Sequence, residues 1–173
     1  MINVIVACDS CGGIGKDHGI PWSVVPADIR RFKQLTVDNV VVMGSGTWNS
    51  YGMKKPLPNR INVVITSHPD FCAGADQYIT ENIIESILDL EKQHPDKIIW
   101  IIGGGHVISQ CIDIIDEWYI TRFNMDMKCD VFIPKVWEDD KYQLVSVELC
   151  DHETVTIVPR YYSDLRFEVW KLI

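Results

Sequence analysis

Long apolar runs, an excess of basic residues and repetitive segments are all missing from this sequence of 173 residues. No apolar run approaches the roughly 18 residues that a helix needs to cross a bilayer, so we expect a soluble protein with no membrane partner. The formal net charge of −8 argues against a nucleic-acid partner, because broad neutralisation of phosphates needs a clustered basic face. Since no repeat or Gly/Ser-rich linker divides the chain, residues 1–173 are expected to form one domain.

The amino-terminal segment lacks the marks of a secretory signal. Residues 1–7 are apolar but short, with no basic leader and no small-residue cleavage site after them. We therefore expect a first strand there and a cytoplasmic protein. The six cysteines fit a reducing compartment, since most lie singly in or beside apolar segments, where free thiols behave as small hydrophobes.

One cysteine pair, Cys8-x-x-Cys11, has the spacing of redox and zinc motifs. A redox pair should open a helix that lowers the pKa of the first thiol, whereas Gly12-Gly13-Ile14-Gly15 follows here and indicates a loop. A zinc site needs a second pair of ligands at metal spacing, and the other cysteines and histidines supply none. We interpret the pair as a strand-to-loop junction and expect no metal.

Strand and helix patterns alternate through the first two thirds of the chain. Apolar, β-branched runs, typical of strands covered on both faces, occupy residues 2–7, 40–43, 61–66 and 98–102. Helical periodicity occupies residues 27–35, 82–92 and 105–112. This alternation predicts a largely parallel sheet with helices on both faces.

After about residue 116 the pattern changes to strands separated by turns, without a comparable helix. These strands are expected at residues 117–123, 142–150 and 165–172. The carboxy-terminal part should therefore pair antiparallel, which gives one mixed α/β sheet. Two long loops, residues 9–25 with four glycines and residues 52–60 with Pro56 and Pro58, are expected to carry function.

Four short stretches, each a weak signal alone, carry the identification in combination. They are Gly19-Ile20-Pro21-Trp22 leading to Pro26-Ala27-Asp28 and Phe32-Lys33; Val42-Met43-Gly44 with Thr47-Trp48; Pro56-Leu57-Pro58-Asn59-Arg60; and Ile102-Gly103-Gly104-Gly105. The order and spacing of these stretches, and the strands and helices on which they are expected to lie, resemble those of the dihydrofolate reductase family. The resemblance extends from the first strand to about Pro134. The match is looser through the last two strands.

The resemblance implies a fold and an activity. The fold is a single-domain, mixed, mostly parallel eight-stranded sheet with antiparallel carboxy-terminal strands and about four flanking helices. The activity is that of an NADPH-dependent oxidoreductase, which reduces 7,8-dihydrofolate to 5,6,7,8-tetrahydrofolate for one-carbon and thymidylate metabolism. Dihydrofolate and antifolates such as methotrexate are then the expected ligands, and a monomer is the expected state.

Asp28 is the central candidate because it falls in the first turn of a helix whose neighbours, Ile29 and Phe32, are expected to face a core. On position alone, a carboxylate there complements the helix dipole. The resemblance instead implies that Asp28 binds the amino group and ring nitrogen of a pterin, favours the protonated ring, and has no basic partner in the pocket. It also implies that Thr121 hydrogen-bonds this carboxylate. An ordinary strand threonine is the alternative.

Further catalytic roles follow from the resemblance for the glycine-rich loop. Trp22 matches the tryptophan that helps to order a water near the pterin, and residues 15–22 match a mobile loop that closes over the nicotinamide. Ile20 lies in that loop and is included among the catalytic candidates. His18 lies there too, but we interpret it as solvent-exposed rather than as a base.

The run Gly103-Gly104-Gly105 follows a buried strand and opens a helix, where backbone amides can meet a phosphate. It is not G-x-G-x-x-G, and a tight turn alone would need glycine. The resemblance implies a cis peptide between the first two glycines and places Thr47 at the cofactor pyrophosphate. The full set of cofactor candidates is Ala7, Ile14, Gly15, Gly44, Ser45, Gly46, Thr47, Thr66, Ser67, Gly103, Gly104, Gly105, His106, Val107 and Ile108.

Arg60 matches the arginine that clamps a carboxylate of the substrate's glutamate tail. A solvated surface arginine is the alternative. The resemblance also implies an apolar pocket for the pterin and benzoyl groups, although most of its members would be apolar in a plain core as well. With Arg60, the substrate candidates are Ile5, Val6, Ala7, Ile29, Phe32, Lys33, Leu57 and Ile102, and Ile20 adjoins them.

The sequence departs from the family at the adenine ribose. The family commonly has an arginine after Met-Gly, where this chain has Ser45 followed by Gly46, so NADH stays open beside NADPH. Ile108 stands where bacterial members often have a tyrosine near the nicotinamide. A 2′-phosphate could meet other groups instead, drawn from Thr66, Ser67, His68, His106 and Lys54 or Lys55.

Three alternatives compete with this interpretation. A related reductase of riboflavin synthesis would keep the fold, but Asp28 and Arg60 favour folate. A non-catalytic binding or assembly protein would not need both Asp28 and Thr121. A generic Rossmann dehydrogenase would carry a glycine fingerprint after the first strand, which this sequence lacks.

Overall fold

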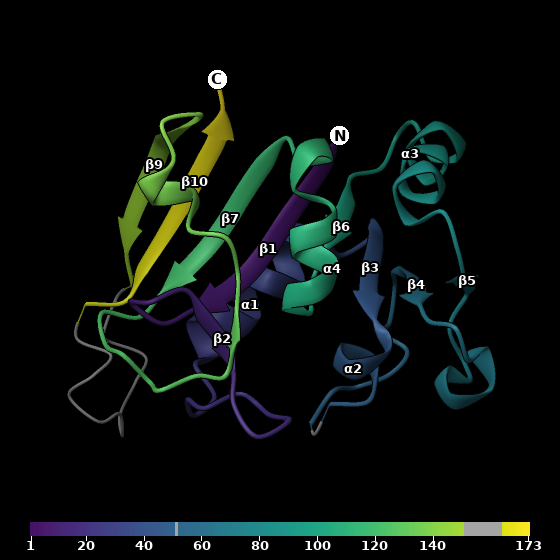
Figure 1. The fold of residues 1–173 in the computed structure, drawn as a ribbon, viewed down its shortest axis with the longest axis horizontal. Helices are drawn as coiled ribbons and strands as arrows, with labels where there is room; N and C mark the ends of the chain where they lie inside the picture. The colour runs from purple at the N-terminus through teal and green to yellow at the C-terminus, as the bar shows by residue number, and fades with distance from the viewer. Residues whose placement is uncertain (51, 151–163) are drawn as a thin grey trace.

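Eight strands form the central sheet, in the order β5-β4-β3-β6-β1-β7-β10-β9 (Figure 1). The computed structural model describes residues 1–50, 52–150 and 164–173. The strands of the sheet are β1 (Ile2–Cys8), β3 (Val40–Gly44), β4 (Ile61–Ile65), β5 (Gln77–Ile79), β6 (Ile99–Ile101), β7 (Glu117–Arg122), β9 (Tyr142–Leu149) and β10 (Arg166–Leu172). The helices are α1 (Pro26–Thr36), α2 (Ser45–Trp48), α3 (Ile83–Gln93) and α4 (Gly105–Gln110), with short 3-10 turns at Pro69–Cys72, Ile112–Ile114 and Val136–Glu138.

The pairing of the strands confirms the predicted mixed sheet. Strand β1 pairs parallel with β6 and β7, β3 pairs parallel with β4 and β6, and β4 pairs parallel with β5. Strand β10 pairs antiparallel with both β7 and β9. The carboxyl ends of six neighbouring parallel strands therefore lie along one edge of the sheet, where ligands bind in open α/β sheets.

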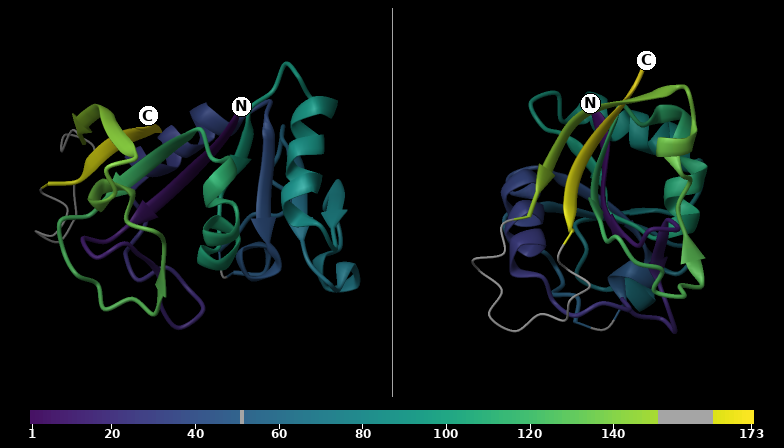
Figure 2. Two further views of the ribbon diagram at one scale, coloured as in Figure 1. Left: turned by 45° about the horizontal axis from the view of Figure 1, so that its top comes forward. Right: turned by 90° about the vertical axis from the view of Figure 1, so that its left-hand side faces the viewer.

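Side chains that alternate along the strands fill two cores on opposite faces of the sheet. In β3, Val40 and Val42 belong to the core beneath α3 and α4, and Val41 and Met43 belong to the core beneath α1 and α2. Figure 2 shows α1 on one side of the sheet and α3 with α4 on the other. Burial on both faces explains why the strands read as continuous apolar runs rather than as alternating ones.

Three short strands were not predicted. Strand β2 (Gly13–Gly15) lies inside the predicted loop 9–25 and pairs antiparallel with β8 (Val131–Phe132), and β5 extends the sheet beyond β4. Glycine has little strand propensity, and β2 is stabilised by a partner more than a hundred residues away, which local pattern cannot indicate. The predicted helix 105–112 is also shorter, because α4 ends at Gln110. The expected single domain, 1–173, includes residue 51 and residues 151–163, which lie outside the described part.

Asp9 organises the start of the glycine-rich loop. Its buried carboxylate accepts hydrogen bonds from the backbone N–H groups of Cys11 at 2.8 Å and Gly13 at 2.7 Å through Oδ1. Its Oδ2 accepts another from the N–H of Met127 at 3.0 Å. A carboxylate that satisfies three backbone donors fixes the loop to the segment that follows β7.

Cys8 ends β1 and is fully buried. Burial raises the pKa of its thiol to about 12, the opposite of what an attacking redox thiol needs. Among the residues that the structure describes, no cluster of three or more His, Cys, Asp or Glu side chains is arranged to hold a metal ion. None of the helices in the described ranges is both long and apolar enough to cross a membrane.

Candidate active site

A half-buried carboxylate and a buried hydroxyl meet where α1 begins beside the sheet. Thr121 of β7 is 1% exposed, and its Oγ1 donates a hydrogen bond to Oδ1 of Asp28 at 2.6 Å. Thr121 stands opposite Ala7 of β1 and opposite Phe167 of β10 in the strand register. Pro26 begins α1, which places Asp28 in its first turn, at the edge formed by the strand carboxyl ends. The predicted pair of Asp28 and Thr121 is therefore brought together.

The surroundings of Asp28 act on its charge in opposite directions. Burial raises the pKa of this carboxyl, while the hydrogen bond from Thr121 and the positive charge of Arg31 lower it. The resemblance implied no basic partner in the pocket for Asp28, and among the described residues no ion pair joins it to a basic side chain. Arg31, whose charge was not considered from the sequence, lies one helical turn from Asp28 on α1.

Apolar side chains extend from Asp28 along the same face of the sheet. The predicted pocket residues Ile5, Phe32, Leu57 and Ile102 pack in the core beneath α1 and α2. Ala7 and Trp22 pack in a third cluster, where the Trp22 ring centroid lies 4.6 Å from that of Phe123. An apolar wall with one carboxylate is suited to a flat heterocycle that carries adjacent N–H donors.

Three predicted pocket residues do not pack in this apolar wall. Ile29 is 51% exposed, because α1 turns Phe32 and Leu35 toward the core and leaves Ile29 on the outer stripe with the exposed Lys33. Ile20 is 63% exposed, in the glycine-rich loop. Val6 packs against the opposite core with Ile14, since neighbouring side chains of a strand point to opposite faces. The interpretation of His18 as an exposed residue is confirmed.

Arg60 is oriented by the end of α1 rather than freely solvated. Its Nε donates to Oγ1 of Thr36 at 2.9 Å, and its Nη1 donates to the carbonyl oxygen of Pro58 at 2.9 Å. The guanidinium lies 5.7 Å from the ring centroid of Phe32. A planar guanidinium held in this way is prepared to take a carboxylate at the open end of the apolar wall.

A glycine turn joins two further strand ends. The N–H of Gly44 donates to the carbonyl oxygen of Gly103 at 2.9 Å, and the peptide between Gly103 and Gly104 is cis, as predicted. Gly103 has a φ of +132°, and a Cβ there would lie 3.1 Å from Oγ1 of Thr47. The turn therefore brings the first residues of α2 and α4 close together, with main chain rather than side chains between them.

The other cofactor candidates divide between the surface and the core. Ser67 and His106 are exposed, Ser45 is partly exposed, and Gly46 faces open space. Thr66 is buried, and its Oγ1 accepts the N–H of His68 at 3.0 Å. The other buried residues of the set are Gly15, Gly103, Gly105, Val107 and Ile108.

Ile108, a cofactor candidate, is 0% exposed and packs in the core beneath α3 and α4. Val107 belongs to the same core. The second and third residues after the glycine turn thus anchor α4, and their side chains are not available to a ligand at the surface. The accessible polar groups around the turn, on Ser45, Thr47, Ser67 and His106, are suited to hold an anionic dinucleotide.

Comparisons with known proteins agree on one family. The family model described as "Dihydrofolate reductase" matches residues 1–165. A dihydrofolate reductase from Bacillus subtilis is 32% identical over 149 residues, which cover 86% of this chain and 83% of that protein. A bifunctional dihydrofolate reductase-thymidylate synthase from Arabidopsis thaliana is 35% identical over 148 residues, 77% of this chain. The chain matches only 26% of the length of that bifunctional relative.

A solved structure extends the likeness to the whole fold. Dihydrofolate reductase from Enterococcus faecalis, complexed with NADP(H) and RAB-propyl, superposes with a TM-score of 0.76 at 28% sequence identity. The superposition covers 99% of this chain and 96% of that one. With an eight-stranded sheet of the expected topology and matches along nearly its whole length, this chain belongs to the dihydrofolate reductase family.

Proposed function

We propose that this protein reduces 7,8-dihydrofolate to 5,6,7,8-tetrahydrofolate with NADPH, and the observation that carries the proposal is the carboxylate of Asp28 hydrogen-bonded to the buried hydroxyl of Thr121. A pterin presents an amino group and an adjacent ring N–H along one edge. Those two donors match the two oxygens of one carboxylate. Reductases in the family from Bacillus subtilis and Enterococcus faecalis support the assignment.

Reduction of the C=N bond requires a hydride at carbon and a proton at nitrogen. When bound, NADPH supplies the hydride and becomes NADP⁺. Asp28 orients the pterin edge and favours the protonated ring, because a nearby negative charge stabilises a developing positive one. Thr121 fixes the rotamer of Asp28 from the sheet side. Trp22, whose ring packs at a tilt against that of Phe123, lies on the loop side, where we place the water that delivers the proton.

The glycine turn fits a dinucleotide by shape rather than by charge. Gly103 and Gly104 expose main chain next to Thr47, where a Cβ on either glycine would lie 3.1 to 3.4 Å from Oγ1. We assign the pyrophosphate to Thr47 and the backbone amides that begin α4, with Ser45, Ser67 and His106 around the adenosine end. Arg60 would hold the glutamate tail of the substrate.

We further propose that the protein acts as a cytoplasmic monomer and binds antifolates such as methotrexate at Asp28. No disulfide joins the cysteines that the structure describes, which suits a reducing compartment. An antifolate with a diaminopyrimidine edge offers the carboxylate the same pair of donors as the pterin does.

Replacing Thr121 by valine is expected to lower kcat/KM for dihydrofolate about tenfold, because a hydrogen bond to a charged group contributes roughly 1.5–3 kcal/mol. The lost bond favoured the ionised form, so its removal raises the pKa of Asp28 and moves the acidic limb of kcat/KM to higher pH. Thr121→Ser, which keeps the hydroxyl, is the control. A valine variant with an unmoved acidic limb would remove Thr121 from this role.

Replacing Ser45 by arginine is expected to tighten NADPH binding about tenfold while leaving NADH nearly unchanged, because a guanidinium can pair with the 2′-phosphate that only NADPH carries. Fluorescence titration of both cofactors measures the two dissociation constants. Ser45→Gln is the uncharged control of similar length. Equal gains for NADPH and NADH would place Ser45 away from the adenosine ribose.

The reductase activity itself is tested by following cofactor oxidation with dihydrofolate, in separate reactions with NADPH and with NADH. We expect turnover with NADPH that methotrexate abolishes at stoichiometric concentration. If the folded protein oxidises neither cofactor and fails to bind methotrexate, the proposed function is wrong.

A further inference from the structure

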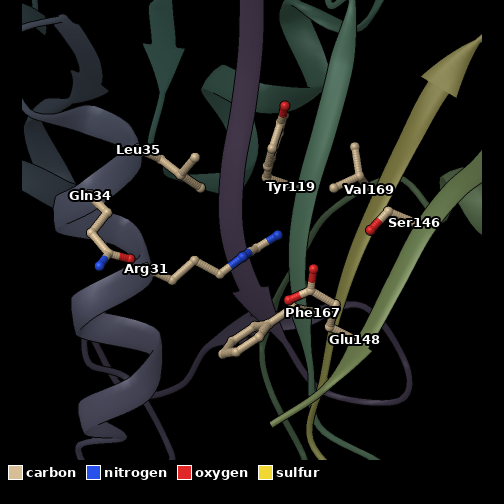
Figure 3. Close-up of a pocket in the computed structure, with 8 residues that line it drawn as sticks. All are labelled: Arg31, Gln34, Leu35, Tyr119, Ser146, Glu148, Phe167 and Val169. Atoms are coloured by element: carbon tan, nitrogen blue, oxygen red, sulfur yellow. The ribbon is translucent and has the colours of Figure 1, made fainter.

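Arg31 lies one helical turn after Asp28 on α1, and its guanidinium packs against two aromatic rings of the sheet. Figure 3 shows its side chain extending from α1 across to the sheet, toward Phe167 and Tyr119. The guanidinium carbon lies 5.6 Å from the ring centroid of Tyr119 and 4.8 Å from that of Phe167. Two aromatic faces hold the cation in place through cation–π attraction. A cavity of about 250 Å³ adjoins it, lined also by Gln34, Leu35, Ser146, Glu148 and Val169.

Asp28 and Arg31 contact neighbouring residues on one face of the sheet. Thr121, which binds Asp28, faces Phe167 across the β7–β10 pair, and Tyr119 stands two residues before Thr121 on the same face of β7. On the helix, Asp28 and Arg31 are one turn apart and so share a face. The carboxylate of Asp28 and the guanidinium of Arg31 therefore lie on the same face of α1 and meet the same face of the β7–β10 pair.

Arg31 acts on Asp28 without a direct contact. Within the described part of the chain, no ion pair joins Arg31 to a carboxylate, and its Nη1 is buried without a hydrogen-bond partner. A direct salt bridge would occupy the carboxylate oxygens that a pterin needs. A cation one helical turn away, outside ion-pair distance, stabilises the negative charge and leaves those oxygens for Thr121 and the substrate.

The other charged groups around Arg31 are few. Glu148 lines the cavity from β9, the exposed edge strand. Its negative charge, like that of Asp28, interacts electrostatically with the guanidinium of Arg31. The phenol of Tyr119 donates to Glu117 at 3.0 Å, and burial raises its pKa, so it stays neutral. From β10, only the apolar Phe167 and Val169 line the cavity, and from α1 the remaining polar group is the amide of Gln34.

We propose that Arg31 is a positioning residue of this reductase, whose fixed guanidinium keeps Asp28 in the carboxylate form that binds the pterin; the assignment rests on the proposed function. Burial raises the pKa of Asp28. Without Arg31, the hydrogen bond from the Thr121 hydroxyl would be the main remaining interaction that lowers it. The carboxylate would then be protonated over a wider acidic range, and the neutral acid cannot form the charged pair with a protonated ring.

The test is an NMR titration of the Asp28 side-chain carboxyl in the ligand-free protein, which needs no activity. Arg31→Met should move the titration midpoint to higher pH, and Arg31→Lys should restore part of the difference. Arg30→Met is the matched control, because Arg30 neighbours Arg31 on α1, carries the same charge and is exposed. If Arg31→Met does not fold, Arg31→Gln takes its place. Equal midpoints for the Arg31 and Arg30 variants would overturn the proposal.

Steady-state kinetics then separate this proposal from the proposed function. In Arg31→Met, kcat/KM for dihydrofolate should fall about tenfold on the acidic side of the profile and approach the parent value at alkaline pH. A parent protein without dihydrofolate turnover would refute the function and leave the titration of Asp28 interpretable. An active parent with an unshifted Arg31→Met midpoint would refute only the role of Arg31.

Discussion

Asp28→Asn is expected to fold like the parent protein and to reduce dihydrofolate about 100- to 1,000-fold more slowly at neutral pH, a loss in the range seen when one preorganised charge is removed from an active site. The amide keeps the shape of the carboxylate and accepts the hydrogen bond from Thr121, so the contact between α1 and β7 survives. It carries no negative charge, however, and cannot favour the protonated pterin.

The pH dependence of this variant distinguishes a charge effect from a packing defect. As the solution becomes more acidic, dihydrofolate protonates without help, so the variant should recover part of its rate. Stopped-flow measurement of hydride transfer across the pH range would show this recovery, with circular dichroism as the check on folding. Unchanged activity at neutral pH would remove Asp28 from its role, and a uniform loss at every pH would indicate damage to packing.

Gly105→Ala is the second large effect that we expect. A Cβ on Gly105 would lie 2.5 Å from the carbonyl oxygen of Phe132 and 3.1 Å from Cγ1 of Val131, both on β8. Because the first of these is a backbone atom, β8 and α4 must move apart, and overpacking of this kind costs roughly 1–3 kcal/mol. The same movement displaces the start of α4. We therefore expect Gly105→Ala both to lower the stability of the fold and to weaken the binding of NADPH.

Chemical denaturation and a fluorescence titration with NADPH measure the two consequences of Gly105→Ala. Gly46→Ala is the matched control for stability, since a Cβ there meets no atom within 4 Å and the residue lies in α2. We expect the midpoint of unfolding to fall in Gly105→Ala and to stay near the parent value, or to rise slightly, in Gly46→Ala. Equal midpoints for the two variants would show that α4 and β8 are not in tight contact.

The regular elements were predictable because their local patterns carry the physical cause of their structure. The continuous apolar runs of β1 and β3 follow from burial on both faces, and α1 begins at Pro26 and buries Phe32 and Leu35 as helical spacing requires. The pairing of β2 with β8 was not predictable, because a glycine-rich strand is defined by its distant partner rather than by its own residues.

The candidate site shows a similar division. Asp28 and Thr121 are separated by 93 positions, and only the family resemblance linked them before their hydrogen bond was seen. Composition and spacing identify apolar residues but not the face that each one occupies, so the exposure of Ile29 and the packing of Val6 against the opposite core were not predicted. The role that we assign to Arg31 needs the strand register and two aromatic rings from different strands, which no local pattern contains.

The most direct test of hydride transfer to the pterin is isotopic. The protein is incubated with dihydrofolate and NADPH deuterated at the reactive carbon of the nicotinamide, and tetrahydrofolate is analysed by mass spectrometry and NMR. We predict one deuterium at the reduced ring carbon with the parent protein, and little incorporation in the same time with Asp28→Asn at neutral pH. Tetrahydrofolate without label, or no tetrahydrofolate from the folded parent protein, would contradict the account.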